Sequence, residues 1–221
     1  DLRMSRGLGD VYKRQEMDYS LYVCTDRDIM TTDTLEEAVE LAIKGGATII
    51  QLREKDCTSR EFYELALSIK DITDAYEVPL IINDRLDIAL AVHADGVHLG
   101  QSDIPVQVAR NVMGPNCIVG ATANTLEKAK EAWQSGADYL GVGDVFGSAT
   151  KNDTKPVELK ELKKICDTVK IPVVAIGGIS KKNIHLLKDT GVAGVAVISA
   201  VLGQTDITAA AEELISGSPE A

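Results

Sequence analysis

Residues 79–103, which read PLIINDRLDIALAVHADGVHLGQSD, decide how this chain folds. The apolar start of the stretch predicts a short buried strand that ends at Asn83 and Asp84, and a second short strand follows at 96–99. A helix-like run joins the two strands, so we expect parallel neighbours whose ends lie ~5 Å apart. Asp84 and Asp103 would then leave the same end of the sheet and could reach one hard cation such as Mg²⁺. An alternative stays open, because both aspartates also stand where they could cap the helices that follow them.

The same alternation of strand and helix repeats through the rest of the chain. Short runs that are apolar on both faces are typical of parallel strands covered by helices, and they predict strands at 20–24, 48–52, 80–83, 96–99, 118–122, 139–142, 172–176 and 194–198. Helical spacing predicts a helix after each strand, with Ser59 as the N-cap of the second helix, at 35–44, 59–76, 85–92, 105–113, 126–135, 156–169, 183–189 and 205–216. Eight such units predict a single-domain α/β fold, a closed (β/α)₈ TIM barrel. A doubly wound open sheet is the alternative, but no G-x-G-x-x-G follows the first strand.

The two ends of the chain do not share this pattern. Residues 1–16 are rich in glycine and arginine, show neither helical nor strand periodicity, and lack the apolar core of a signal peptide. The patterned sequence begins at Met17, a natural start position, and the stretch before it resembles translated adapter sequence. We therefore expect residues 1–16 to be a non-native or disordered tail, residues 17–217 to form the barrel domain, and residues 218–221 to form a C-terminal tail.

The composition limits the classes of partner. The chain has 221 residues and a formal net charge of −11, which argues against nucleic acid or an anionic membrane surface as a partner. No apolar run approaches the ~20 residues that a membrane helix needs. The four cysteines are scattered without a C-x-x-C pair, which favours reduced thiols in the cytoplasm over a zinc site or a disulfide framework. We expect a cytoplasmic protein whose partners are small molecules, and a homo-oligomer is compatible with the sequence.

Polar side chains gather at the residues that follow the predicted strands, where a barrel carries its site. These positions hold three cations, two carboxylates, several hydroxyls and a glycine turn: Gln51, Arg53, Lys55, Asn83, Asp84, Gln101, Asp103, Thr122, Asn124, Ser148, Thr150, Lys151, Gly177, Gly178, Ile198 and Ser199.

A first anion site is expected around the basic side chains. Arg53, Lys55 and Lys151, with a cation held by Asp84 and Asp103, carry too much positive charge for a single carboxylate. They suit a diphosphate bound through Mg²⁺. The alternative for Arg53 and Lys55 is a solvated loop with ordinary ion pairs.

A second anion site is expected where the last two strands end. The Gly177–Gly178 turn and the helix start after Ser199 occupy the usual phosphate position of barrels, built from backbone N–H groups and a helix N-terminus. A tight turn without a ligand is the alternative. The loop 143–154 is either a lid over an anionic substrate or an exposed connection, and His98 is expected in the core rather than in catalysis.

With these residues in view, the chain resembles the thiamine phosphate synthase family from residue 17 to about residue 216. Each matching motif is weak alone, and the set in this order is specific: YVCTD at 22–26, QLREK at 51–55, NDRLDIA at 83–89, DGVHLGQSD at 95–103, GADYLGVG at 136–143 and VAIGGI at 174–179. The resemblance implies a Mg²⁺-dependent transferase that joins a hydroxymethylpyrimidine diphosphate to a thiazole phosphate and releases pyrophosphate. In that family the pyrophosphate is thought to leave first, and the thiazole nitrogen then attacks a pyrimidine carbocation.

The resemblance also implies where the substrates and the metal bind. Asp84 and Asp103 would be the Mg²⁺ ligands. The pyrimidine diphosphate would be held by Gln51, Arg53 and Lys55, with Asn83 and Lys151 beside it. The thiazole phosphate would be held by Ser148, Ala149, Thr150, Gly178, Ile198 and Ser199. Thr122 stands where the family usually has serine and is expected to contact substrate, which gives a catalytic set of Arg53, Lys55, Lys151 and Thr122.

Two departures from the family pattern bear on the alternatives. Asn124 stands where the family usually has histidine, and Asp144 and Gly147 replace two prolines of the sixth-strand loop. A thiazole tautomerase of the same barrel family would need a proton-transfer residue near the fifth strand, and Asn124 cannot serve as one. A non-catalytic regulator that binds phosphometabolites would leave the paired aspartates unexplained. The synthase is therefore the preferred hypothesis.

Overall fold

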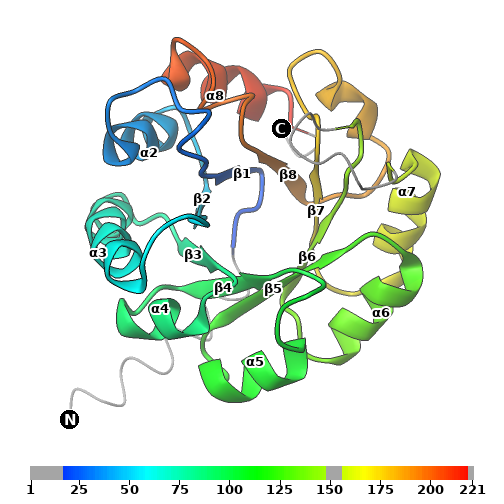
Figure 1. Cartoon of the computed structure of the whole chain (residues 1–221). Coiled ribbons are helices and arrows are strands. Elements are labelled where there is room, and N and C mark those ends of the chain that lie inside the picture. Colours follow the sequence, from blue (N-terminus) through cyan, green and yellow to red (C-terminus); the bar gives the residue numbers. More distant parts are fainter. Residues whose placement is uncertain (1–16, 148–155, 219–221) are drawn as a thin grey trace.

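A computed structural model describes residues 17–147 and 156–218 of the chain. Within these ranges the strands pair in parallel in the order β1 to β8, and β1 pairs with β8 to close the barrel (Figure 1). The predicted (β/α)₈ barrel is confirmed. The strands are β1 Leu21–Cys24, β2 Ile49–Leu52, β3 Leu80–Asn83, β4 Gly96–Leu99, β5 Ile118–Ala123, β6 Tyr139–Val142, β7 Val173–Ile176 and β8 Gly194–Val197.

Helices form the outer layer around the ring of strands (Figure 1). They are α2 Leu35–Lys44, α3 Ser59–Ala75, α4 Leu86–Ala91, α5 Val106–Met113, α6 Leu126–Gln134, α7 Leu159–Thr168, the 3₁₀ helix η1 Ile184–Leu187, and α8 Ile207–Ser216. Among the described residues, no helix combines the length and the apolar character that crossing a membrane requires. Of the predicted tails, 1–16 and 218–221, all residues but Ser218 lie outside the described residues, and Ser218 is buried.

Apolar side chains fill two separate layers. The larger layer lies between the strands and the helices, where α2 contributes Leu35 and Val39 and α3 contributes Phe62 and Ile69. The smaller layer lies inside the barrel and is unusually aromatic, since Tyr22 and Tyr139 are both buried there with several aliphatic side chains. Each fully buried aliphatic side chain contributes about 1.5–3 kcal/mol relative to an exposed one, so the outer layer supplies most of the apolar stabilisation.

Helix caps set where the outer helices begin. The Thr34 hydroxyl accepts a hydrogen bond from Glu37 N at 3.2 Å at the start of α2. At the start of α3 the N-cap is Thr58, whose side chain accepts from Glu61 N while the Glu61 carboxylate accepts from Thr58 N at 2.7 Å. The prediction of Ser59 as this cap is therefore wrong by one residue, because the reciprocal bonds of a capping box need a spacing of three residues.

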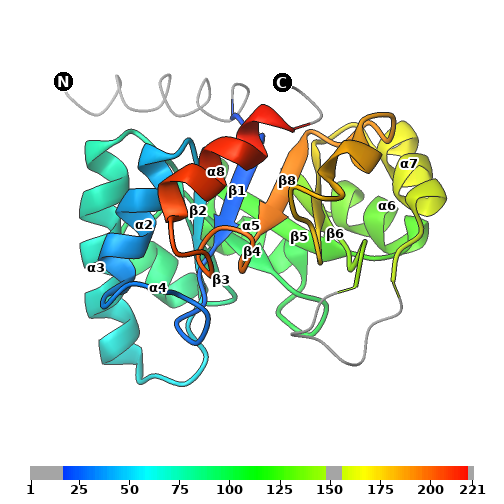
Figure 2. The same ribbon diagram turned by 90° about the horizontal axis from the view of Figure 1, so that it is seen from above.

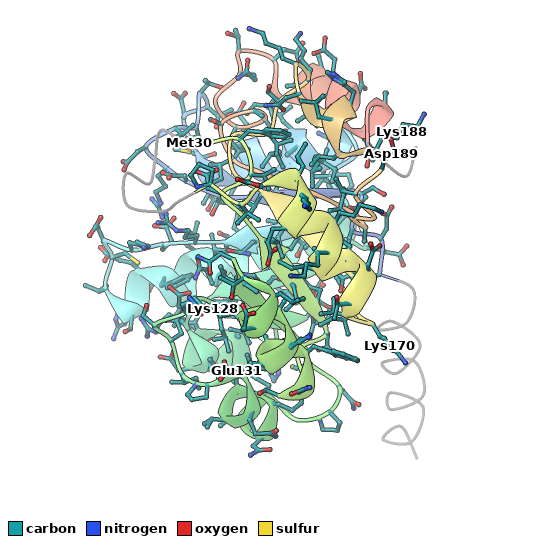
Figure 3. The ribbon with its side chains drawn as sticks, turned by 90° about the vertical axis from the view of Figure 1, so that its right-hand side faces the viewer. Met30, Lys128, Glu131, Lys170, Lys188 and Asp189 are labelled. Atoms are coloured by element: carbon teal, nitrogen blue, oxygen red, sulfur yellow. The ribbon has the colours of Figure 1, made fainter. Side chains whose placement is uncertain are left out.

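The loops at the carboxyl ends of the strands lie at one end of the barrel. The loop after β1, drawn in blue, lies at the lower end of the barrel in Figure 2. The outer surfaces of the helices are polar, and Figure 3 shows charged side chains such as Glu131 of α6 and Lys170 beyond α7 on the surface. We use the word rim for the carboxyl ends of the strands and the loops that follow them.

Candidate active site at the rim

The two predicted metal carboxylates lie together at the rim. β3 and β4 are neighbours, with Asn83 opposite His98, and the strand pairing extends one residue further because Asp84 N donates to His98 O at 2.9 Å. The Asp103 carboxyl group is close enough to Asp84 to act on its pKa both through a hydrogen bond and through its charge. Burial, and then the hydrogen bond and charge of Asp103, raise the pKa of Asp84 from 3.8 to about 6, against the opposing effect of Lys55 and Arg53.

Neither carboxylate caps a helix. The N-cap of α4 is Arg85, and no side chain forms a cap hydrogen bond there. The N-cap of α5 is Pro105, again without a side-chain cap. The Asp103 carboxylate instead accepts from Gly100 N at 2.6 Å, and the Asn83 amide donates to the Asp84 carboxylate. The capping alternative is therefore wrong for both aspartates, because each side chain is used within the rim.

Two of the predicted cations lie beside this acid pair. Both Arg53 and Lys55 lower the pKa of Asp84 by their charge, so both lie on the same side of the barrel mouth. The end of β2 is fixed to the loop after β1, since Arg53 N donates to Thr25 Oγ1 at 3.0 Å and its guanidinium lies 3.8 Å from Asp26 Oδ2. Glu54, which lies between the two cations in the sequence, pairs with Arg27 at 2.9 Å instead.

Gln51 and Thr122 face the barrel interior below the rim. Gln51 is 6% exposed, and its Nε2 donates to the Tyr22 hydroxyl at 2.8 Å. Thr122 Oγ1 lies 2.9 Å from Nε2 of His98, which also points into the interior and not towards the helices. The sequence reasoning missed Tyr22 as a neighbour of the site. A tyrosine inside an otherwise apolar strand was the available signal, since a buried hydroxyl needs a hydrogen-bond partner.

The predicted second anion site lies at the ends of two neighbouring strands. β7 pairs with β8 with Ile176 opposite Ala196, so Gly178 and Ile198 follow adjacent strand ends. Gly178 has a φ of 63°, and a Cβ there would lie 2.2 Å from Gly147 O. The helix after Ser199, predicted from residue 205, begins at Ile207, and a helical turn closed by Leu202 N donating to Ile198 O at 2.9 Å comes before it.

Only the first residues of the loop after β6 are among the described residues. Ser148, Ala149, Thr150 and Lys151 lie outside the described residues, as does most of the predicted lid 143–154. The described start of the loop runs along the end of β7, where Val145 N donates to Ile176 O and Phe146 N to Gly177 O, both at 3.0 Å. Asp144, one of the departures from the family pattern, is 9% exposed at this position.

The other departure leaves a buried acceptor at the rim. Asn124 directly follows β5, and its Oδ1 is buried and has no hydrogen-bond partner among the described residues. A buried carbonyl without a partner costs about 1–3 kcal/mol. Such groups are rare outside functional sites.

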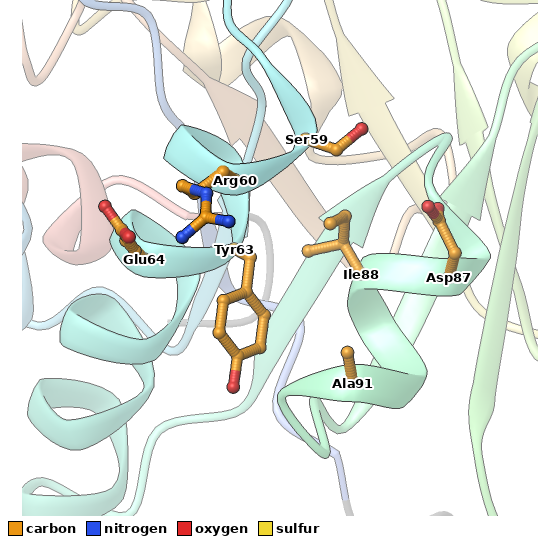
Figure 4. Close-up of a pocket in the computed structure, with 7 residues that line it drawn as sticks. All are labelled: Ser59, Arg60, Tyr63, Glu64, Asp87, Ile88 and Ala91. Atoms are coloured by element: carbon orange, nitrogen blue, oxygen red, sulfur yellow. The ribbon is translucent and has the colours of Figure 1, made fainter.

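A groove on the outside of the barrel holds none of the predicted site residues. It lies between α3 and α4, has a volume of about 450 Å³, and is lined in part by Ser59, Tyr63 and Ile88 (Figure 4). Arg85 contacts two of the lining residues, since its guanidinium donates to Ser59 Oγ at 2.9 Å and pairs with Asp87 at 2.6 Å. Of the charged groups at this groove, Asp87 is paired with Arg85.

The donor set at the rim suits a divalent cation that keeps part of its own shell. In the described part of the chain, no group of three or more His, Cys, Asp or Glu side chains could hold a metal ion. Mg²⁺ commonly binds one or two carboxylates and takes its other ligands from water and substrate phosphates. Asp84 and Asp103 repel each other when both are ionised, and a divalent cation between them would remove that repulsion.

A closed barrel of parallel strands whose carboxyl ends collect an acid pair and two cations has the organisation of a (β/α)₈-barrel enzyme. Comparison with known proteins identifies the family more narrowly. Residues 21–201 match the family model of thiamine monophosphate synthase, and the chain belongs to that family.

Curated relatives and a solved structure agree with this assignment. Thiamine-phosphate synthase of Ruminiclostridium cellulolyticum is 55% identical over 202 residues, which cover 91% of this chain and 96% of that protein. Thiamine-phosphate synthase of Clostridium beijerinckii is 53% identical over 201 residues, with 91% and 96% covered. The structure of thiamine phosphate pyrophosphorylase from Pyrococcus furiosus superposes with a TM-score of 0.84 at 46% identity, covering 91% of this chain and 96% of that chain. The protein is therefore an enzyme, a transferase of thiamine biosynthesis.

Proposed function

We propose that this enzyme condenses 4-amino-2-methyl-5-hydroxymethylpyrimidine diphosphate with a thiazole phosphate to give thiamine phosphate and pyrophosphate. The thiazole substrate is hydroxyethylthiazole phosphate or its carboxylated form. The observation that carries the proposal is the acid pair Asp84–Asp103, which lies within the electrostatic range of Arg53 and Lys55 at the mouth of the barrel. Opposite charges arranged in this way suit a diphosphate that is bound by cations on one side and by a shared metal on the other.

The proposed metal is Mg²⁺, held by Asp84 and Asp103. The chemistry that Mg²⁺ would supply there is neutralisation of charge on the leaving diphosphate, which Asp84 and Asp103 would position. The Asn83 amide donates to the Asp84 carboxylate and fixes the direction in which that carboxylate points. The left-handed backbone of Asp84, with a φ of 64°, turns the chain away from the strand and directs the side chain towards Asp103.

The proposed reaction needs no nucleophile or general base from the protein. The bond between the pyrimidine methylene carbon and the diphosphate oxygen breaks, and its electron pair leaves with pyrophosphate. The lone pair of the thiazole nitrogen then forms the new carbon–nitrogen bond to the pyrimidine carbocation. Arg53, Lys55 and Lys151 would stabilise the charge that develops on the leaving group, and removal of one such donor typically costs a factor of about 10²–10³ in rate.

The remaining site residues would hold the two substrates in line. Gln51 and Thr122 would contact opposite edges of the pyrimidine, because they project from strands on opposite sides of the barrel mouth. Gly178, Ile198 and Ser199 would bind the thiazole phosphate through backbone N–H groups, together with Ser148, Ala149 and Thr150. The absence of a Cβ at Gly178 lets the start of the loop after β6 pack against this turn, since a Cβ there would lie 2.2 Å from Gly147 O.

The test is a complete reaction with purified protein. Incubation with both substrates and Mg²⁺ should yield thiamine phosphate and pyrophosphate in equal amounts. Asp84→Ala should abolish this turnover while the circular dichroism spectrum stays that of the wild type. Asp167→Ala, which removes an exposed carboxylate from α7 that pairs with Lys163 at 3.6 Å, is the control and should keep full activity.

The other hypotheses give different results in the same assay. A thiazole tautomerase would convert the thiazole phosphate alone and would form no thiamine phosphate. A regulator would bind the substrates without turnover. Either result, or full activity in Asp84→Ala, would refute the proposal.

A further inference from the structure

A chain of hydrogen bonds crosses the barrel interior and joins two residues of the proposed pyrimidine site. Gln51 Nε2 donates to the Tyr22 hydroxyl at 2.8 Å, and the hydroxyl oxygens of Tyr22 and Tyr139 lie 2.7 Å apart. The Tyr139 hydroxyl lies 2.9 Å from His98 Nδ1, and His98 Nε2 lies 2.9 Å from Thr122 Oγ1. These five side chains come from β2, β1, β6, β4 and β5, and we call them the interior relay.

Two glycines clear the space that the relay occupies. A Cβ on Gly120 would lie 2.1 Å from Tyr139 Cζ, and a Cβ on Gly141 would lie 3.1 Å from His98 Cε1. The Tyr139 ring fills this space and lies 5.8 Å from the ring of Tyr22 and 5.5 Å from that of His98, measured between centroids. Glycine at these two positions of β5 and β6 thus leaves the room in which the polar aromatic rings meet.

The relay residues are too deeply buried to lose their hydrogen bonds cheaply. Tyr139 is fully buried and Tyr22 is 1% exposed. Burial is the main cause that raises the pKa of both tyrosines well above the ordinary value, so both are neutral hydroxyls with one proton each. A buried hydroxyl left without its partner keeps the full cost of its lost hydration, which strongly favours a state in which every bond of the relay is formed.

One proton on each tyrosine gives the relay a direction. The Tyr22 oxygen accepts from Gln51, so its proton points to Tyr139, and the Tyr139 proton then points to His98 Nδ1. Neutral imidazole carries one proton, which this arrangement places on His98 Nε2, where it is donated to Thr122 Oγ1. Gln51 consequently turns its carbonyl oxygen away from Tyr22, and the Thr122 hydroxyl keeps its own proton for another acceptor.

We infer that Tyr22, Tyr139 and His98 are positioning residues. Together they determine whether Gln51 and Thr122 each present a hydrogen-bond donor or an acceptor. Gln51 presents an acceptor to the mouth of the barrel and Thr122 presents a donor. This inference rests on the proposed function and deepens it. An aminopyrimidine carries an amino donor on one carbon and a ring-nitrogen acceptor at the position opposite to it, so the pair matches the two ends of that ring. If Gln51 presents a donor instead of an acceptor, the relay forces Thr122 to present an acceptor instead of a donor.

The first test needs no substrate. The chain has three histidines, and the variant His93→Asn/His185→Gln removes the two exposed ones and leaves His98 alone. Nitrogen-15 NMR at pH 8 should show His98 neutral, with the proton on Nε2 and none on Nδ1. A proton on Nδ1, or a charged imidazolium at this pH, would overturn the inferred direction of the relay.

The second test separates positioning from packing by kinetics. Tyr22→Phe and Tyr139→Phe should each raise the KM for the pyrimidine diphosphate about tenfold, which is the effect of one mis-set hydrogen bond. The KM for the thiazole phosphate should not change. Because the relay acts in series, the double variant should be no more than about twofold worse than Tyr139→Phe. Tyr19→Phe is the matched control, since its ring packs 5.2 Å from Tyr139 while its hydroxyl contacts Met17 Sδ outside the relay.

The outcomes distinguish the relay from the proposed function. A wild-type enzyme without turnover refutes the proposed function, and the histidine measurement then decides the direction of the relay by itself. With turnover established, the relay is refuted by a wild-type KM in both tyrosine variants. It is refuted equally by parallel rises in both KM values, by effects that multiply in the double variant, or by a tenfold effect of Tyr19→Phe.

Discussion

The acid pair at the rim should make the metal-free enzyme less stable at neutral pH than a variant that lacks one of its charges. The pKa of Asp84 is raised from 3.8 to about 6, so the folded protein binds its proton more tightly than the unfolded chain does. This contribution to the free energy of unfolding is fully present below pH 3.8 and is lost as the pH rises through 6. In Asp84→Asn the side chain is neutral at every pH and still donates towards Asp103, so the loss does not occur.

The expected size follows from the change in pKa. At ~1.4 kcal/mol for each tenfold change in the dissociation constant, the rise from 3.8 to about 6 corresponds to about 3 kcal/mol. Asp84 is only half-buried, and solvent screening reduces the effect to roughly 1–2 kcal/mol. For a chain of this size that is an increase in Tm of roughly 2–8 °C for Asp84→Asn at pH 8. Near pH 4 the two proteins should melt together.

The assay is thermal unfolding of wild type and variant from pH 4 to pH 8 in buffer with a chelator. Mg²⁺ added at pH 8 should stabilise the wild type and not the variant, because the ligand binds only the folded wild-type site. Asp87→Asn is the control of opposite sign, since its ion pair with Arg85 lowers the pKa of Asp87 and its removal should destabilise at pH 8. A variant of Asp84 that is no more stable than wild type at pH 8 would refute the reasoning.

Three further predictions concern a cation, a glycine and a helix cap. Lys55→Met should lower kcat about 100-fold without lowering Tm, because it removes charge stabilisation of the leaving group and no buried contact; steady-state kinetics within threefold of wild type would contradict it. Gly120→Ala should destabilise by about 1–3 kcal/mol, because its Cβ would lie 2.1 Å from Tyr139 Cζ, and a wild-type melting curve would show that the ring has another place to go. Thr58→Ala should cost about 1 kcal/mol in urea unfolding while Thr58→Ser costs little, since the capping box with Glu61 needs only a hydroxyl; equal losses in both variants would argue against the cap.

The barrel could be predicted from sequence because its strands carry a local signal. Four-residue apolar runs between glycine or proline punctuation give β3, β4 and β6 with both bounds correct. Helix starts were less accurate, since they depend on contacts made elsewhere in the chain. The helix predicted from residue 156 begins at Leu159, because Val157 is buried and its N–H donates to Asp144 O at 2.7 Å. The T-x-x-E spacing from Thr58 to Glu61 is present in the sequence and indicates the correct cap, one residue before Ser59.

The gathering of polar residues at the rim was predictable from sequence, but the hydrogen bonds between side chains inside the barrel were not. A strand that is buried on both faces has no polar side, so its pattern does not tell which alternate residues point into the barrel. The sequence therefore predicts His98 in the core without showing which layer it enters, because its bond to Tyr139 depends on the pairing of the neighbouring strands β4, β5 and β6.

The acid pair also explains why Asp84 has a backbone conformation that the fold by itself would not select. A φ of 64° is uncommon for a residue with a side chain, although aspartate tolerates it better than most. The strand pairing to His98 O holds the residue in place, and the left-handed turn is what brings its carboxylate to Asp103. Both the conformation and the repulsion between the carboxylates disfavour the folded chain when considered alone. A cation between the two groups would offset both costs. A substitution of Asp84 that stabilises the metal-free protein should therefore weaken metal binding.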